Sequence, residues 1–183
     1  MTRRHDRTLW LSTIADRIDR VIDLLGQGLS WLVGVTVVTC ALVALLRYAF
    51  GLGWVWMQDA YVWANATMFM LAAAPTLLHG KHVRVDFFYT NARPRTRAAI
   101  NLFGVLFLLL PSVVTIFLLC LPYVQDSLSR LEGALDVGGL PGVFLLKAVL
   151  LLFCIPLAAQ GLSLAIRSWI SLFDADRDTG ALS

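Results

Sequence analysis

Four stretches of this sequence carry no charged side chain and are long enough to cross a lipid bilayer as helices. They are Leu24–Leu46, Ala60–Leu78, Ala98–Val124 and Ala148–Ile166. A helix needs roughly 20 apolar residues to cross a hydrocarbon core of about 30 Å. A mean hydropathy of +0.75 with only 15% charged residues excludes a water-soluble domain. We therefore predict an all-α integral membrane protein with four transmembrane helices.

The membrane domain is predicted at residues 24–169, with spans at about 24–46, 60–78, 98–124 and 141–167. The fourth span is placed to begin before Lys147, because residues 137–146 are uncharged and Pro141 suits the first turn of a helix. Lys147 would then snorkel to the interface, or pair with Asp136, Glu132 or another subunit.

The two ends of the chain are more polar than the membrane domain. In residues 1–23, apolar residues recur at helical spacing with Asp and Arg between them. This pattern predicts an amphipathic helix that lies in the membrane interface or leads into the first span. Residues 170–183 are predicted to form a short tail.

The distribution of Lys and Arg predicts the orientation in the membrane. Most of them lie in the N-terminal segment, in the His79–Arg97 loop and in the tail. Basic residues close to a span are retained in the cytoplasm. We therefore expect both termini and this loop to be cytoplasmic, and the chain to lie in a bacterial inner membrane. Trp54, in the first outward connection, fits an outer aromatic belt.

Residues that would support catalysis or a cofactor are scarce. His79 and His82 lie three residues apart at one membrane edge, and no other span offers the facing histidine that haem requires. The cysteines are isolated in apolar runs, and no nucleophile or phosphate-binding motif is present. We expect no enzyme activity, no cofactor, no metal and no nucleic-acid binding.

Three passages carry a resemblance to a known family. They are "WVWMQDAYVWA" at the second span, "HGKHVRVDFF" after it, and "LEGALDVGGLPGVFLLKAVLLLFCIPLAAQGLS" over the outer loop and last span. Together, across roughly Leu24–Trp169, they resemble the small permease subunit of TRAP (tripartite ATP-independent periplasmic) transporters, the DctQ-type family. Asp59 departs from the pattern, since many relatives carry Glu there.

The resemblance implies a role in sodium-driven, binding-protein-dependent uptake of an organic acid. The implied partners are a large membrane subunit of the DctM type and a periplasmic substrate-binding protein of the DctP type. The small subunit would pack against and extend the scaffold of the large one, and would bind neither substrate nor sodium. The alternative is an unrelated four-helix membrane subunit, for electron transfer or as a small membrane enzyme, which a Soret band in the purified protein would favour.

The resemblance also indicates residues expected at subunit interfaces. On the cytoplasmic side these are His82, Arg84 and Asp86. The outer-side candidates, together with the lysine of the last span, are Trp54, Asp59, Gly138, Gly139, Pro141 and Lys147. With no partner, the first set would be a solvated basic loop and the second an aromatic belt followed by a turn.

Overall fold

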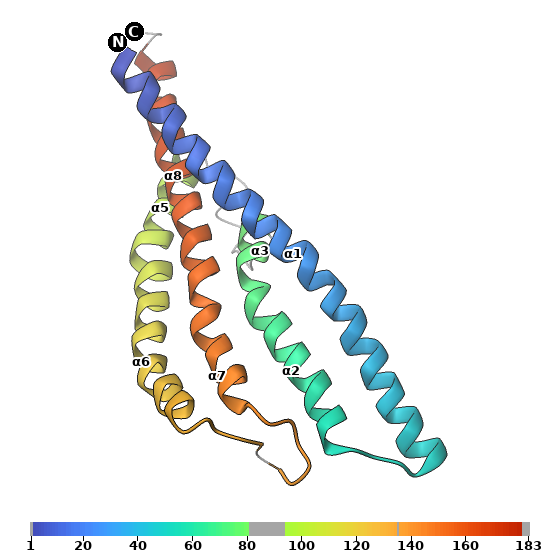
Figure 1. Ribbon diagram of the computed structural model, residues 1–183. Helices are drawn as coiled ribbons and strands as arrows, with labels where there is room; N and C mark the ends of the chain where they lie inside the picture. Colours follow the sequence, from blue (N-terminus) through green and yellow to red (C-terminus); the bar gives the residue numbers. More distant parts are fainter. Residues whose placement is uncertain (1, 81–93, 135, 181–183) are drawn as a thin grey trace. The chain divides into compact units, whose positions relative to one another are not determined.

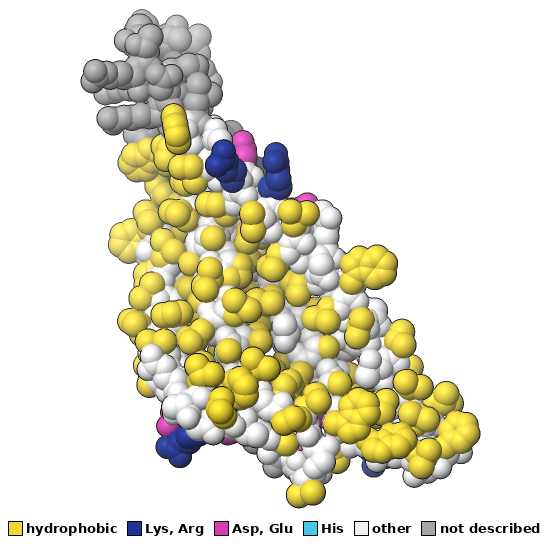
Figure 2. All heavy atoms as spheres, viewed as in Figure 1, with side chains coloured by type: hydrophobic (Ala, Val, Ile, Leu, Met, Phe, Trp, Pro, Cys, Tyr) yellow, Lys and Arg dark blue, Asp and Glu magenta, His cyan; other side chains and the backbone are white. Residues whose placement is uncertain are grey.

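The computed structural model describes residues 2–80, 94–134 and 136–180, and every regular element in this part of the chain is a helix. Four helical stretches are long and apolar enough to cross a membrane: Trp10–Phe50, Val55–Leu78, Arg95–Ser129 and Val143–Leu172. The predicted fold class, all-α with four transmembrane helices, is confirmed. Hydrophobic side chains cover most of the face seen in Figure 2, as expected of a protein whose solvent is lipid.

The helices follow one another in a simple order along the chain (Figure 1). Helix α1 covers Thr2–Phe50, so the predicted amphipathic segment and the first span form one continuous helix. The remaining elements are α2 (Val55–Leu71), α3 (Ala73–Leu78), α5 (Pro94–Phe103), the π-helix η1 (Gly104–Leu109), α6 (Leu110–Ser129), α7 (Val143–Leu152) and α8 (Cys154–Gly180). Helix α8 therefore continues well into the segment predicted as a tail.

Prolines account for two of the interruptions within the spans. A proline has no N–H to donate and crowds the preceding turn of a helix. Pro75 and Pro156 each lie three residues after a break, at Ala72 and at Phe153 respectively. These breaks divide α2 from α3 and α7 from α8. Pro141 differs from the prediction: it lies in the connection before α7, because Gly142 caps that helix with a φ of 111°, which is not helical.

The chain divides into two compact units. The first contains Met1–Asp23, Ala74–Val114 and Pro156–Ser183, and the second contains Leu24–Ala73 and Thr115–Ile155. The connections at residues 51–54 and 130–142 belong to the second unit.

Small and polar residues let the helices of the first unit approach closely. Ala15 and Ser163 are both fully buried, and the Ser163 hydroxyl lies 3.4 Å from the Ala15 carbonyl oxygen. On another side of α8, a Cβ placed on Gly161 would come within 2.6 Å of the Leu109 side chain. Glycine is therefore needed for α8 to pack at this distance.

In the second unit, α2 packs against α7. The buried apolar residues of the second unit are Leu71, Val124, Val143 and Cys154. Ser127 is its buried polar residue. This packing brings Asp59 on α2 to the connection that precedes α7. The fold thereby brings together several of the residues that the sequence indicated on the outer side.

Candidate functional site

The first polar feature is a turn held by a carboxylate in the second unit. The Leu140 backbone N–H donates to Asp59 Oδ2 over 2.9 Å, and the Gly139 N–H donates to the Asp136 carbonyl over 3.0 Å. A Cβ on Gly139 would come within 2.6 Å of that same Asp59 oxygen. Asp59 and Gly139 are therefore matched: the carboxylate can cap the turn only because the residue beside it has no side chain.

The neighbouring predicted residues complete this outer turn. Gly138 has a φ of 84°, in the left-handed region that glycine tolerates best. Pro141 is exposed and follows directly after the capped residue. Trp54 is the N-cap residue of α2, with its side chain partly exposed and no side-chain cap hydrogen bond. The fold joins Asp59, Gly138, Gly139 and Pro141 in one turn, with Trp54 at the start of the helix that carries Asp59.

The second polar feature of this unit is a cluster around Glu132. Lys147 Nζ and Ser127 Oγ each donate to Glu132 Oε2 over 2.5 Å. The Lys147 ammonium also lies 4.2 Å from the centre of the Tyr123 ring, a distance that gives a cation–π interaction. Of the alternatives that the sequence left open for Lys147, the structure supports pairing, and the partner is Glu132.

The charge of Glu132 depends on this cluster. Hydrogen bonds from Lys147 and then from Ser127 hold the pKa of the Glu132 carboxyl below its usual value, against a smaller opposing effect of desolvation. The carboxylate is therefore ionised at neutral pH and compensates the lysine charge in the last span. A lysine left without this partner would be costly at that depth.

The chain turns into this cluster through an unusual helix end. The Glu132 N–H donates to the Ser127 carbonyl and the Leu131 N–H to the Leu128 carbonyl, which is the pattern of a Schellman cap. The left-handed position of such a cap is usually glycine, but here it is Leu131, with a φ of 46°. The contacts of Glu132 thus help to hold a strained backbone in place.

A third polar feature, in the first unit, joins α1 to α8 through Asp19. Ser163 donates to Asp19 Oδ1 over 2.6 Å and Gln160 Nε2 over 3.1 Å, while Arg167 Nε donates to Asp19 Oδ2 over 2.9 Å. Arg167 Nη2 makes a further bond to the same oxygen and another, of 2.7 Å, to Asp16 Oδ1. The three donors are spaced at i, i+3 and i+7, so they project from one face of α8.

A smaller ion pair lies near this cluster at the end of α3. His79 Nε2 is 3.2 Å from Asp23 Oδ1, and both side chains are about half exposed. The pair connects α1 with His79, the histidine that precedes His82 by three positions. His82, Arg84 and Asp86 themselves lie outside the described residues.

Sequence reasoning missed the Asp19 cluster. Asp16, Asp19 and Asp23 are spaced at i, i+3 and i+7, a signal that these carboxylates share one face of the N-terminal helix. From the sequence we predict only an amphipathic helix for this segment, with no partner for any of its carboxylates. Ser163 and Gln160 gave no sequence signal of their own, because single polar residues in a span commonly bond within their own helix.

These polar features join helices and compensate charges within the chain. Within the described residues, no group of three or more His, Cys, Asp or Glu side chains could hold a metal ion. Each of the three carboxylates at the centre of these features is bound to donors of the same chain.

Comparison with known proteins identifies the family. A family model described as "Tripartite ATP-independent periplasmic transporters, DctQ component" matches residues 35–171. Searches of curated proteins and of solved structures found no match. The matched region contains the outer turn, the Glu132 cluster and the α8 side of the Asp19 cluster, and it confirms the resemblance seen in the sequence. The chain belongs to the DctQ component family of tripartite ATP-independent periplasmic transporters, and is a small subunit of such a transporter.

Proposed function

We propose that this chain packs against the scaffold of a large DctM-type membrane subunit and extends it, in a transporter that takes up an organic acid with sodium. A DctP-type periplasmic binding protein would deliver the substrate to the large subunit. The sodium and organic-acid parts of this proposal rest on the family resemblance. The scaffold part has further support in the surfaces and the charges of the described residues.

The observation that carries the scaffold role is how little the spans cover one another. The buried share of the most apolar window is 6% in Trp10–Phe50 and reaches only 28% in Val143–Leu172. Lipid would cover much of this surface, but a four-helix protein with so little internal coverage also has ample area to offer a larger membrane subunit. Helices in membranes associate through such close contacts of their side chains.

The charged groups near the spans support the same role. Lys147 is engaged by Glu132, and Arg167 by Asp19 and Asp16. A substrate path for an organic anion requires cationic or polar groups that are free to bind and release it. These two cations are already compensated within the chain, so we place the substrate path in the large subunit.

We further propose that the chain lies in the bacterial inner membrane with both termini in the cytoplasm. The distribution of Lys and Arg supports this orientation. The outer turn of Asp59, Gly138, Gly139 and Pro141 would then face the periplasm, together with Trp54, Glu132 and Lys147. His82, Arg84 and Asp86 would face the cytoplasm as contacts for assembly.

Co-purification tests the proposed function most directly. The tagged full chain, produced with the proteins encoded beside it, is expected to bring down a large multispanning membrane protein. Uptake of a labelled organic acid by cells with the complete set should require this chain and a sodium gradient. Failure to recover any large membrane partner would overturn the proposal.

The cytoplasmic contacts can be tested against a matched control. Arg84→Ala with Asp86→Ala is expected to reduce recovery of the large subunit several-fold, without changing which substrate is taken up. The control is Arg130→Ala with Asp126→Ala, which removes the same two charges from an exposed pair. An altered substrate preference, or equal loss of the partner in the control, would contradict the proposed assembly role.

A further inference from the structure

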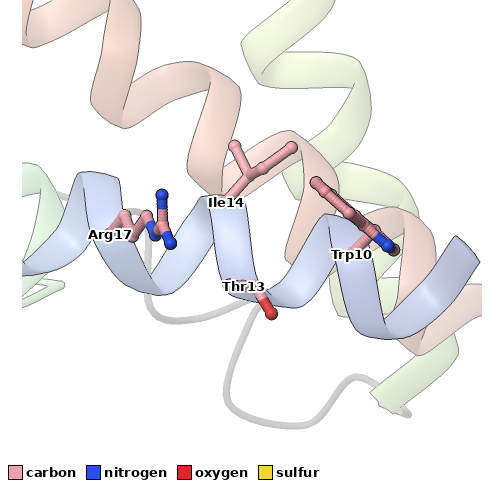
Figure 3. Close-up of a pocket in the computed structure, with 4 residues that line it drawn as sticks. All are labelled: Trp10, Thr13, Ile14 and Arg17. Atoms are coloured by element: carbon pink, nitrogen blue, oxygen red, sulfur yellow. The ribbon is translucent and has the colours of Figure 1, made fainter. Parts of the chain in front are cut away.

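The first turns of α1 carry a strip of side chains that the proposed function does not use. Trp10, Ile14 and Arg17 follow one another along about two turns of the helix and, with Thr13, line a hollow of about 420 Å³ (Figure 3). The Trp10 side chain is 73% exposed. Val21, which is also exposed, continues the same line one turn further. A large aromatic ring, aliphatic side chains and a guanidinium thus share one outward face.

The charges of this segment are divided between two faces of α1. Asp16 and Asp19 bind Arg167 on α8. Arg17 and Arg20 are exposed, and neither has an acidic partner among the residues that the structure describes. At 3.6 residues per turn, Arg17 projects from nearly the opposite side of the helix to Asp19, and Arg20 projects between Arg17 and Asp16. The acidic residues are therefore neutralised within the chain, while the outward strip remains cationic.

The position of the strip along α1 is set by the length of the apolar helix. The candidate span Trp10–Phe50 has 41 residues. At 1.5 Å per residue it measures about 60 Å, roughly twice the thickness of a hydrocarbon core. The uncharged stretch Leu24–Leu46 is the part suited to that core. Arg20 and Arg17 lie about 6 and 10 Å before Leu24 on this continuous helix, near the headgroup region, and Trp10 lies farther from the core.

We propose that the strip formed by Trp10, Ile14, Arg17 and Arg20 binds an anionic phospholipid. The two guanidinium groups would donate hydrogen bonds to the phosphate, a geometry for which Arg is well suited. Val21, which lies closer to the core than either arginine, would contact the first part of an acyl chain, while Ile14 and Trp10 lie farther out and would flank the headgroup. This inference concerns lipid binding by the chain itself and goes beyond its role as a transporter subunit.

Charge complementarity favours lipid over a protein as the occupant. A protein partner would have to present carboxylates opposite both Arg17 and Arg20 at the membrane surface. A bilayer presents phosphate groups everywhere at that depth, and those of anionic lipids lack a compensating amine in the headgroup. Cationic residues beside a span attract such lipids measurably, by about fivefold for each residue.

The first test compares two lipids on the purified full chain. Native mass spectrometry in detergent measures the retention of phosphatidylglycerol and of phosphatidylcholine with the same acyl chains. The wild type is expected to retain phosphatidylglycerol preferentially, and Arg17→Gln with Arg20→Gln should lower the preference by more than about fivefold. Equal retention of the two lipids by the wild type would overturn the proposal.

The control removes the same charge from elsewhere on the surface. Arg47 and Arg130 are exposed as well, so Arg47→Gln with Arg130→Gln gives the same change of net charge outside the strip. Because these two arginines lie at separate sites and do not share one phosphate, this variant should lower the preference much less than the Arg17 and Arg20 variant. A loss as large as that of the Arg17 and Arg20 variant would show a general charge effect and would also overturn the proposal.

A second test keeps both arginines and distinguishes a bound lipid from a protein partner. A photo-crosslinking amino acid replaces Thr13, which lines the hollow, in cells that produce the whole transporter. Irradiation is expected to give an adduct with the mass of an anionic phospholipid. A dominant adduct with another protein subunit would contradict the proposal and assign the strip to a protein interface.

Discussion

The Asp19 cluster and the Glu132 cluster use the same chemistry for different mechanical purposes. In each, a carboxylate accepts hydrogen bonds from a hydroxyl and a cation of the same chain. Asp19 lies within one helix and all of its donors project from another, so the cluster joins α1 to α8. Glu132 lies just after the end of α6, so its cluster fixes where the chain leaves that helix. An ion pair near a membrane surface can thus join helices or shape a loop, depending on whether its acid lies inside a helix.

Removal of Asp19 is expected to have the largest effect on stability. Asp19→Ala leaves Gln160 without its acceptor, Ser163 with only its long contact to the Ala15 carbonyl, and Arg167 with only Asp16. We expect a loss of about 2 kcal/mol in the free energy of unfolding, after allowance for the partial exposure of Arg167. The apparent melting temperature in detergent measures it.

The matched control is Asp16→Ala, which removes an acid that is more exposed and makes one contact with Arg167. It should lower the free energy of unfolding by less than about 1 kcal/mol. Equal losses in the two variants would mean that Asp19 has no special place in the joining of α1 to α8.

The outer turn should be sensitive to a single methyl group. Gly139→Ala places a Cβ against Asp59 Oδ2 and near the Asp136 carbonyl, so the bond to the Leu140 N–H must break or lengthen. We expect a loss of about 1–2 kcal/mol in the free energy of unfolding, smaller than for Asp19 because a carboxylate can rotate away. Thermal unfolding of the variant in detergent provides the measurement.

Gly133→Ala gives the same change of residue in the same connection, at a site where a Cβ would meet nothing within 4 Å. It should leave the melting temperature unchanged. If both alanine variants behave alike, the close approach of Gly139 and Asp59 does not shape the turn.

The stability that the Glu132 cluster contributes should vary with pH, and this variation should require Lys147. We expect it to be the smallest of these effects. Because the pKa of Glu132 is lowered by Lys147 and Ser127, its carboxylate stabilises the fold fully above the ordinary value of 4.5. That stabilisation is lost as the pH falls through the lowered value. The melting temperature of the wild type should therefore exceed that of Glu132→Gln most at neutral pH, and the difference should shrink in acid. A Lys147→Met background should reduce this pH dependence, and a difference that does not vary with pH would refute the assigned pairing.

The sequence predicted the fold class because the relevant signal is local. An uncharged run such as Leu24–Leu46 can be identified as a span without any knowledge of the residues it packs against. The ends of the helices were harder to predict from the sequence. Helix α1 begins far before the uncharged run that starts at Leu24, and α7 begins only after Gly142. Charged residues do not end a helix, and the left-handed conformation of a glycine depends on the turn around it.

The polar features were partly predictable, for a similar reason. Lys147 stood out because it is a charged residue within a predicted span, and the family resemblance indicated Asp59 and Gly139. Their partners could not be assigned, because Asp59 binds a backbone N–H that lies 81 positions along the chain. Asp19 pairs across a still longer separation, and only the packing of α1 on α8 selects Ser163 and Gln160 as its donors.

The helix breaks before Pro75 and Pro156 have a spectroscopic consequence. The carbonyl groups of Leu71 and Leu152 lie four residues before these prolines and so receive no helical N–H from them. Water is scarce at this depth, so a carbonyl without a donor vibrates at higher frequency than its hydrogen-bonded neighbours. Isotope labels at these two positions would therefore act as infrared reporters of local hydration, and of any hydroxyl group that bends over to bind them.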